Sequence, residues 1–269
     1  MHEQGAGLIN LENSRKILET YRPRASLIPA DVDLTAAACP YAWPHCAQPL
    51  YHGAMPFMFN ATVANGMGVV GWLEAAPEWI PDDAAEEGTT RSSSSGDASR
   101  SKIGGAHLDV RFAHSEVLWP WSGYLALYVR VRESAKALQG VASGTVRFAV
   151  CSPPGEGEEE IRRSVVEARL AFQIAPTPPR SRRLLWSQYH SVRYPPGYVP
   201  RDNLDAKNDI LDWHGDHPHT NFHGWFDHLR ASGYFVEILG SPLTCFDATN
   251  YGALLLVDSE EEFLSLIHI

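Results

Sequence analysis

The chain has 269 residues, of which 44% are hydrophobic and eight are tryptophan, so it can form one large or two ordinary packed domains. Its 32 acidic residues outnumber its 22 basic ones, and the net charge of −10 argues against nucleic acid or anionic lipid as a partner. No apolar run approaches the ~20 residues of a membrane-spanning helix, and no signal-peptide core follows Met1.

The N-terminal segment, residues 1–21, is predicted to contain a helix. Leu11, Ile17 and Leu18 supply apolar contacts at helical spacing, and Pro23 ends the pattern. We expect this helix to be loosely held, because the segment has no core of its own to pack against.

Between Ser26 and Ile174 the hydrophobic period changes to two. The alternating apolar positions are Phe57, Phe59, Ala61 and Val63, then Leu125, Leu127, Val129 and Val131, then Val146, Phe148 and Val150, and finally Val166, Ala168, Leu170, Phe172 and Ile174. Short alternating strands separated by turn residues predict an antiparallel β-sandwich over residues 25–175. Within it, Pro81–Gly105 is rich in Ser, Gly and acidic residues and is predicted to be a disordered insertion.

A Pro-rich linker, residues 176–183, precedes a different pattern. Leu184–Trp186, Tyr234–Leu239 and Leu254–Val257 are predicted strands, and Phe222 to Leu229 carries apolar residues at helical spacing before a C-capping Gly233. Strands that alternate with helices indicate an α/β domain with a parallel, flavodoxin- or glutamine-amidotransferase-like sheet, here over residues 184–263. Such a sheet needs more strands than these, so we expect this domain to be incomplete and the sequence to be a piece of a longer protein.

Long sequence motifs identify a family. PTPPRSRRLLWSQYH, NDILDWHGDHPHTNF, HLRASGYFVEILG and YGALLLVDSEEEF follow one another, and EQGAGLINL, CPYAWPHCAQP and VLWPWSGYLA precede them. Together they resemble the lumenal region downstream of the catalytic domain in the site-1-protease family of subtilisin-like serine proteases. The resemblance covers all but Pro81–Gly105 and Leu264–Ile269, and we interpret the latter hexapeptide as a non-native tail.

The resemblance implies a function for the longer protein. That protein would be a single-pass membrane endopeptidase of the endoplasmic reticulum and Golgi that performs regulated proteolysis of membrane-bound transcription factor precursors, with its signal peptide and anchor outside this sequence. Residues 1–24 would be the C-terminal tail of its catalytic domain. The present chain would be a noncatalytic accessory region whose partners are the catalytic domain in cis and a lumenal protein, and no cofactor is expected.

No catalytic residue is assigned in this chain. A subtilisin-type nucleophile needs a GTSxA-like setting, which is absent from the sequence, so we expect the chain alone to cleave no RxLL-type peptide, the kind that this family prefers. An independent amidotransferase-like enzyme would need a GxCxG-type nucleophile elbow, which is also absent, and Cys245 is interpreted as a loop or buried residue.

Residues 209–219 concentrate acidic and histidine side chains between a predicted strand and a helix. Asp216, His217 and His219 fit the family pattern and are the candidate ligands for zinc or a similar ion. A helix start there would also suit an anion, and these residue types equally form ordinary turns and caps. The alternative function is therefore a lumenal module that binds a ligand or partner through this loop or the sandwich, without protease activity.

Two modifications are predicted for a lumenal chain. Cys39 and Cys46 bracket a Pro-containing loop and are expected to form a disulfide, with free thiols or half of a metal site as the alternatives, while Cys151 and Cys245 are expected to stay unpaired. Asn60 begins an Asn-Ala-Thr sequon and is predicted to point outward and carry a glycan.

Two tryptophans allow two interpretations. Trp119 and Trp121 in VLWPWSGY either mark a surface for a partner or carbohydrate or, as is more usual, fill the sandwich core.

Overall fold

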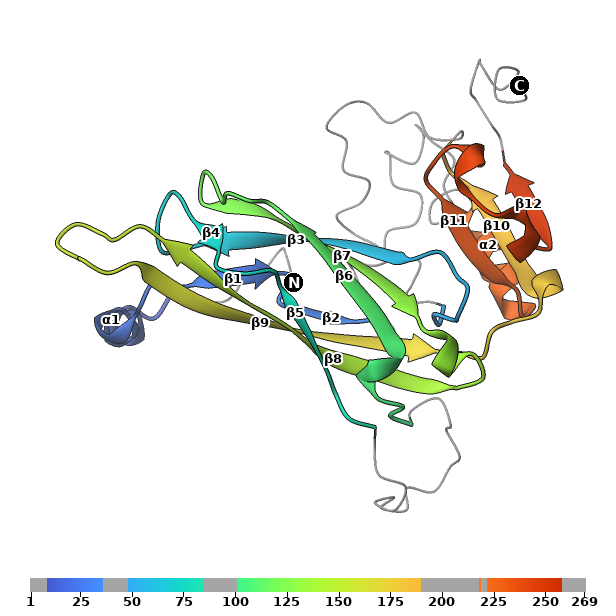
Figure 1. Cartoon of the computed structure of the whole chain (residues 1–269), viewed down its shortest axis with the longest axis horizontal. Coiled ribbons are helices and arrows are strands. Elements are labelled where there is room, and N and C mark those ends of the chain that lie inside the picture. The colour runs from blue at the N-terminus through green and yellow to red at the C-terminus, as the bar shows by residue number, and fades with distance from the viewer. Residues whose placement is uncertain (1–8, 36–47, 85–100, 190–217, 219–221, 258–269) are drawn as a thin grey trace.

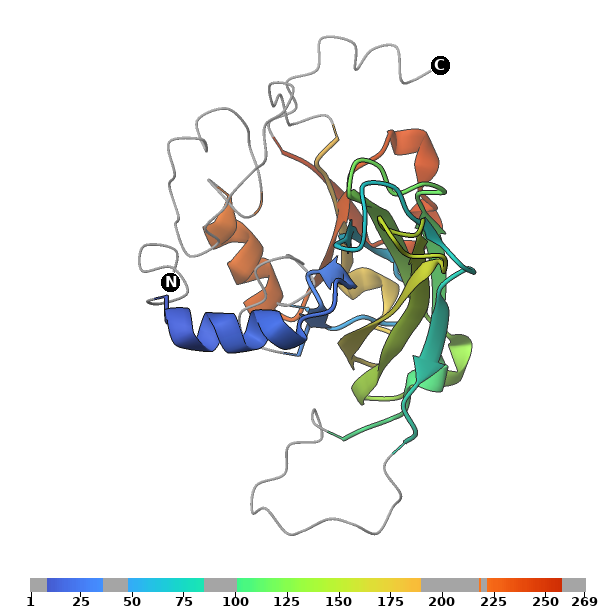
Figure 2. The ribbon, with the colours of Figure 1, turned by 90° about the vertical axis from the view of Figure 1, so that its left-hand side faces the viewer.

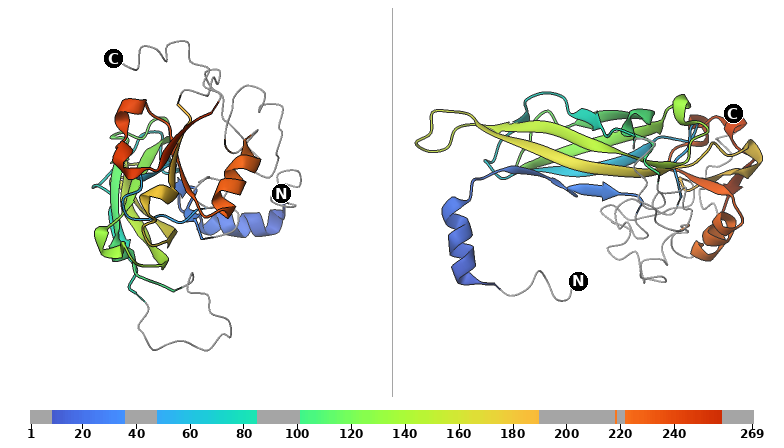
Figure 3. Two further views of the ribbon diagram at one scale, coloured as in Figure 1. Left: turned by 90° about the vertical axis from the view of Figure 1, so that its right-hand side faces the viewer. Right: turned by 90° about the horizontal axis from the view of Figure 1, so that it is seen from below.

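The computed structural model describes residues 9–35, 48–84, 101–189, 218 and 222–257. A β-sandwich makes up most of the described chain, and a small three-stranded sheet with one helix lies at one end of it (Figure 1). A separate helix projects near the opposite end (Figures 1 and 3).

Two sheets form the sandwich. The first has the order β1-β3-β7-β6 and consists of β1 (Ala25–Ile28), β3 (Phe57–Asn65), β7 (Ser122–Val131) and β6 (Leu108–His114). The second has the order β2-β9-β8-β4 and consists of β2 (Asp31–Asp33), β9 (Arg162–Ile174), β8 (Gly140–Ser152) and β4 (Trp72–Leu73), with β5 (Glu78–Pro81) also paired to β8.

The predicted sandwich is confirmed, but it is not purely antiparallel. β2 pairs with β9 in parallel, with Val32 opposite Leu170. Only Pro29 and Ala30 separate β1 from β2, so the chain passes from one sheet to the other without a hairpin. Alternation of apolar residues reports which face of a strand is buried and contains no information on the direction of its neighbour.

The core lies between the two sheets and contains the predicted alternating residues. In β3, Phe57, Phe59, Ala61 and Val63 are buried while the residues between them are exposed or half-buried. The ring of Phe57 meets that of Phe172 from the facing sheet edge-on, with centroids 5.4 Å apart. Aromatic and branched side chains from both inner faces therefore interdigitate, as sandwich packing requires.

The described ends of the predicted insertion 81–105 are ordered. Pro81 is the last residue of β5, the amide of Gly105 donates to the carbonyl of Asp82 at 2.9 Å, and the amide of Ile103 donates to Val141 O at 3.0 Å. The prediction of disorder was wrong at these positions, because backbone hydrogen bonds to β8 and β5 satisfy them; residues 85–100 lie outside the described ranges.

Three parallel strands form the small sheet, in the order β11-β10-β12. They are β10 (Arg183–Ser187), β11 (Phe235–Leu239) and β12 (Ala253–Leu256), and the helix α2 (His223–Ala231) precedes β11. Short 3-10 turns, some of them in the sandwich, are η3 (Gly105–His107), η4 (Glu133–Ala135), η5 (Arg180–Arg182), η7 (Leu243–Cys245) and η8 (Ala248–Asn250).

The central strand β10 is buried on both faces. Leu184 and Trp186 face α2, where the Trp186 ring lies 5.0 Å from that of Trp225 and packs with Phe226. Leu185 faces the other side, toward Leu239 and Tyr251. A strand covered on both faces is typical of the middle of a parallel sheet.

The predicted cap at the end of α2 is confirmed. Gly233 has φ +81°, its amide donates to Arg230 O at 2.9 Å, and the Tyr234 amide donates to Leu229 O at 3.1 Å. This hydrogen-bond pair is a Schellman motif, which requires a left-handed residue and therefore favours glycine.

The N-terminal helix α1 (Leu11–Thr20) begins at the capping residue Asn10, whose side chain accepts from the Asn13 amide at 3.0 Å. It ends before Pro23, as predicted, and none of its residues is buried. Figure 2 shows α1 standing clear of both sheets. Of the two α-helices described, neither has the length and apolar content to cross a membrane.

Candidate functional site

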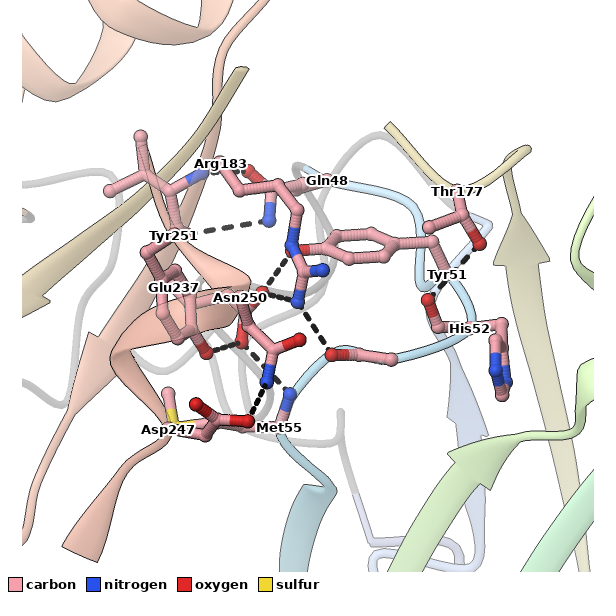
Figure 4. A network of polar contacts seen from close by, with 12 residues as sticks. Gln48, Tyr51, His52, Met55, Thr177, Arg183, Glu237, Asp247, Asn250 and Tyr251 are labelled. Atoms are coloured by element: carbon pink, nitrogen blue, oxygen red, sulfur yellow. Dashed lines mark hydrogen bonds and ion pairs between the residues drawn. The ribbon is translucent and has the colours of Figure 1, made fainter. Parts of the chain in front are cut away.

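A network of buried polar side chains joins the sandwich to the small sheet (Figure 4). Residues 48–55, which directly precede β3 in the chain, reach the face of the small sheet that α2 does not cover. Met55 packs there against Leu185, Leu239 and Tyr251. We call the polar contacts among Tyr51, Arg183, Glu237 and Tyr251 the interdomain joint.

The carboxylate of Glu237 is the centre of the joint. Its Oε1 accepts from the Tyr51 hydroxyl, and its Oε2 accepts from the Tyr251 hydroxyl at 2.7 Å and from the Met55 amide at 2.8 Å. Glu237 is only 8% exposed. Its two oxygens are therefore bonded by groups from both domains, and the buried carboxylate keeps its hydrogen-bond partners.

Arg183 supplies the opposite charge. Its Nη2 lies 3.7 Å from Glu237 Oε1, and both side chains are more than nine-tenths buried. Its Nε donates to the Tyr51 hydroxyl at 3.2 Å and its Nη2 donates to Gly53 O at 2.5 Å. The guanidinium also lies over the rings of Tyr51 and Tyr251, 5.0 and 5.3 Å from their centroids. Stacking and fixed donors of this kind suit arginine and would not suit lysine.

A tight turn brings Arg183 its carbonyl acceptor. Gly53 has φ +85°, and the Ala54 amide closes the turn on Tyr51 O at 3.3 Å. A side chain at this φ would be strained, so glycine allows the backbone of residue 53 to turn its carbonyl toward the guanidinium.

Burial controls the protonation of the two tyrosines. Desolvation, followed by the negative charge of Glu237, raises the pKa of Tyr51 far above its usual 10.0. The pKa of Tyr251 is raised for the same reasons. Both hydroxyls therefore stay protonated at neutral pH and act as hydrogen-bond donors to Glu237.

Gln48 makes a second link between the domains. Its Oε1 accepts from the Val236 amide at 2.8 Å, and its Nε2 donates to Val236 O at 3.3 Å. β11 pairs with β10 on its other side and is an edge strand of the described sheet. One side-chain amide thus satisfies both backbone groups of Val236, as a neighbouring strand would, and covers part of an edge that would otherwise be open to pairing.

The joint is built for stability rather than for chemistry. Glu237 is 8% exposed and both of its carboxylate oxygens accept hydrogen bonds, and the raised pKa values of the two tyrosines keep their hydroxyls protonated, so the joint presents no activated nucleophile. In the described ranges no group of three His, Cys, Asp or Glu side chains could hold a metal ion. The arrangement connects two domains.

The sequence-predicted disulfide and ligand residues lie outside the described residues: Cys39, Cys46 and, in the loop 209–219, Asp216, His217 and His219. Asn60 is exposed in β3 between buried Phe59 and Ala61, so the predicted outward orientation is confirmed and its glycosylation stays a prediction. Cys151 is a buried free thiol and Cys245 an exposed one, as predicted.

The usual interpretation of the two tryptophans is wrong. Trp119 is 66% and Trp121 is 59% exposed, and the neighbouring Leu118 fills the core instead. Leu118 exchanges backbone hydrogen bonds with Gly71 (2.8 and 3.0 Å), so this short segment alternates like a strand and turns Trp119 outward.

The residues of the joint carry only one signal in the sequence. Glu237 stands between Val236 and Ile238 in a strand that is otherwise apolar, and a charge at such a position implies a buried partner. Nothing in the sequence indicates that the partner is Tyr51, which lies 186 residues away.

Two domain families match the chain. Residues 28–177 match the family described as "MBTPS1, third Ig-like domain", and residues 178–266 match "MBTPS1, fourth GATase-like domain". Among solved structures, a family 123 glycoside hydrolase from Clostridium perfringens overlaps 52% of this chain and 25% of its own at 8% identity, but its TM-score of 0.25 is too low to indicate a shared fold.

Longer proteins match nearly the whole chain. Subtilisin-like protease SBT6.1 of Arabidopsis thaliana is 50% identical over 263 residues, and membrane-bound transcription factor site-1 protease is 50% identical over 268 residues in Mus musculus and 49% over 267 in Homo sapiens. Each alignment covers 98% of this chain, which spans 23% of the length of these relatives. The two domains, their order and this identity show that the chain belongs to the site-1 protease family of subtilisin-like proteases.

Proposed function

We propose that the chain is the noncatalytic accessory region of a site-1-protease-like serine endopeptidase that cleaves membrane-bound transcription factor precursors. The name of the mammalian relatives, membrane-bound transcription factor site-1 protease, with about 50% identity over 98% of the chain, supports this substrate class. The whole enzyme would act in the lumen of the endoplasmic reticulum and Golgi, as part of a single-pass membrane protein. In it, these two domains would brace the catalytic domain.

The interdomain joint is the observation that carries this proposal. A buried ion pair whose carboxylate accepts hydrogen bonds from both domains favours one relative orientation of those domains. Fixed orientation is what an accessory region needs in order to support a neighbour, and it gives no advantage to two independent binding modules joined by a flexible linker.

The division of the chain follows from the same proposal. Residues 1–24 would belong to the catalytic domain in cis, 25–175 to the sandwich, 176–183 to the linker and 184–263 to an α/β domain that further strands complete. The unburied helix α1 supports the first of these assignments, because an amphipathic helix with no buried residue leaves its apolar side for a neighbour.

Glycosylation at Asn60 would fit the lumenal location. The exposed asparagine lies in β3 of the sandwich, with Thr62 two residues later on the same face. Treatment of protein from the secretory pathway with an N-glycosidase should lower the mass of the peptide that contains Asn60, and an unmodified Asn60 in such material would refute this assignment.

Peptide hydrolysis tests the proposed function. The purified chain should not cleave an RxLL peptide, whereas the full-length protein should cleave it. In the full-length protein, Glu237→Ala should lower the yield of enzyme counted by active-site titration and leave turnover per active site unchanged, and the exposed Glu74→Ala serves as the matched control. Cleavage by the chain alone, or an unchanged yield after Glu237→Ala, would refute the proposal.

A further inference from the structure

The end of the sandwich opposite the small sheet exposes large apolar side chains. Val69 (46%), Val70 (39%), Val117 (56%), Trp119 (66%) and Trp121 (59%) are all exposed there, and we call these five residues the tryptophan surface. Only Pro120 separates the two tryptophans in the sequence, and grouped exposed apolar and aromatic residues mark interaction sites.

Backbone hydrogen bonds hold the tryptophan surface together. The amide of Trp121 donates to Val69 O at 2.9 Å, and the two bonds between Gly71 and Leu118 place Val70 opposite Trp119. Opposite residues of an antiparallel pair share a face. Because Leu118 is fully buried, Val70 and Trp119 share the outward face.

Trp121 is held in an unfavourable backbone conformation. Its φ of +57° is uncommon for a bulky residue, and it is maintained by the bonds from Trp121 N to Val69 O and from Asn65 N to Trp121 O (2.7 Å). Such conformations persist where the surrounding structure enforces them, and they concentrate at functional positions. Here the result is a tryptophan that faces solvent.

A second unpartnered apolar surface belongs to α1, at the same end of the sandwich as β4 (Figure 1). Leu11, Ile17 and Leu18 fall on one side of α1 and, together with Tyr21 directly after the helix, are 51–80% exposed; we call these four residues the α1 stripe. The opposite side carries two i,i+4 ion pairs, Lys16–Glu12 and Arg15–Glu19, and is suited to water.

The chain connects the two surfaces directly. Three residues after Tyr21, the carbonyl of Arg24 accepts from the Gly66 amide at 3.2 Å. The next residue, Ala25, pairs with Asn65, and the Asn65 amide donates to the carbonyl of Trp121. Figure 1 shows α1 and β4 at the same end of the sandwich, away from the sheet β11-β10-β12. Any domain that packs on α1 is therefore tethered next to Trp121.

We propose that the tryptophan surface docks on the catalytic domain of the same polypeptide, and that the α1 stripe packs within that domain beside the docked surface. This inference rests on the proposed function and names the face that performs the bracing. The short tether selects this occupant over a free partner, because it holds the preceding domain at high effective concentration beside the surface. The joint would then transmit the position of the catalytic domain to the small sheet at the other end.

Hydroxyl-radical footprinting tests the proposal by comparing the 269-residue chain with the full-length protein. Trp119 and Trp121 should be labelled readily in the chain, and their labelling should fall about fivefold or more in the full-length protein, because interface centres are almost fully desolvated. Tyr128, which is 37% exposed on the outer face of β7, is the internal control and should change little.

The outcomes separate this inference from the proposed function. Equal labelling of both tryptophans in the two proteins overturns the inference, and so does protection of the α1 stripe alone. Protection in the isolated chain that increases with concentration would indicate a second copy as the occupant and would also overturn it. The proposed function is decided independently, by peptide hydrolysis and active-site titration.

A variant pair gives a second test. Trp119→Ser with Trp121→Ser should leave the melting temperature of the chain within about 1 °C, because both side chains are already exposed, and should lower that of the full-length catalytic domain by about 3 °C or more. Tyr128→Ser is the matched control and should change neither. A full-length protein that is unaffected by the tryptophan changes would contradict the proposed interface.

Discussion

Replacing Glu237 by alanine tests whether its carboxylate stabilises the joint. In the folded chain, Glu237 accepts from the hydroxyls of Tyr51 and Tyr251 and from the Met55 amide. Without it, three donors lose their acceptor, and Arg183, which is 6% exposed, keeps a buried charge with no counterion. Removing one partner of a buried pair costs about 3–5 kcal/mol, so we expect the free energy of unfolding to fall by about 4 kcal/mol.

Two further variants define the cause. Glu74→Ala removes a surface ion pair with Arg163, in which both side chains are about half exposed (48% and 52%), and should lower the free energy of unfolding much less than Glu237→Ala does. The double variant Arg183→Met, Glu237→Gln leaves no buried charge. It should therefore be more stable than Glu237→Ala and lie within about 2 kcal/mol of the unaltered chain.

Urea unfolding of the chain, followed by tryptophan fluorescence, measures these differences. Trp186, one of the eight tryptophans, is fully buried in β10, so part of the change in emission reports the unfolding of the small sheet. A loss below about 1 kcal/mol for Glu237→Ala would refute the reasoning. So would a double variant whose loss equals the sum of the losses measured for Arg183→Met alone and Glu237→Gln alone, because charge compensation would then contribute nothing.

Three other measurements address single interactions. Because burial raises the pKa of Tyr51, its contribution to stability is present below pH 10 and is lost as pH rises above that value, by up to about 1.4 kcal/mol per pH unit. Tyr51→Phe should therefore make the urea midpoint depend less steeply on pH between about pH 9 and about pH 11. An unchanged dependence of the midpoint on pH would contradict this. Gly233→Ala, at φ +81°, should destabilise the chain by about 1 kcal/mol. Gly224→Ala, inside α2, should stabilise the chain by about 0.5–1 kcal/mol, because the added Cβ would meet open space. Equal effects of the two changes would refute the capping argument. The hydrogen bond from Arg162 lowers the pKa of Glu158 to about 2, so the ion pair is present above that pH and is lost as pH falls through it. Carbon-detected NMR of Arg162→Gln should show the pKa of Glu158 raised back toward 4.5. An unchanged pKa would exclude Arg162 as the cause.

Local patterns in the sequence were sufficient for the elements and their buried faces. Val166, Ala168, Leu170, Phe172 and Ile174 are all buried in β9, because every second side chain of a strand points to the same face. The cap at Gly233 was equally predictable, since a left-handed residue after a helix has few alternatives to glycine.

The candidate site was not predictable in this way. The sequence signals that were selected, Cys39, Cys46 and the loop 209–219, lie outside the described residues, while the joint and the tryptophan surface depend on contacts between distant segments. VLWPWSGY contains the same tryptophans whether they fill a core or face solvent. Their exposure is decided by Leu118, which occupies the core position when Gly71 pairs with it.

The sequence alone determined that this chain contains a sandwich and a parallel α/β sheet and that it resembles the site-1 protease family, because periodicity and long motifs are properties of neighbouring residues. The tertiary structure decided that β2 runs parallel to β9 and that Glu237 meets Tyr51 across 186 residues. It also decided which apolar side chains remain in water. The physical reason is that a buried charge needs a partner, but the charged residue alone does not specify which one. The packing of the two domains decides that.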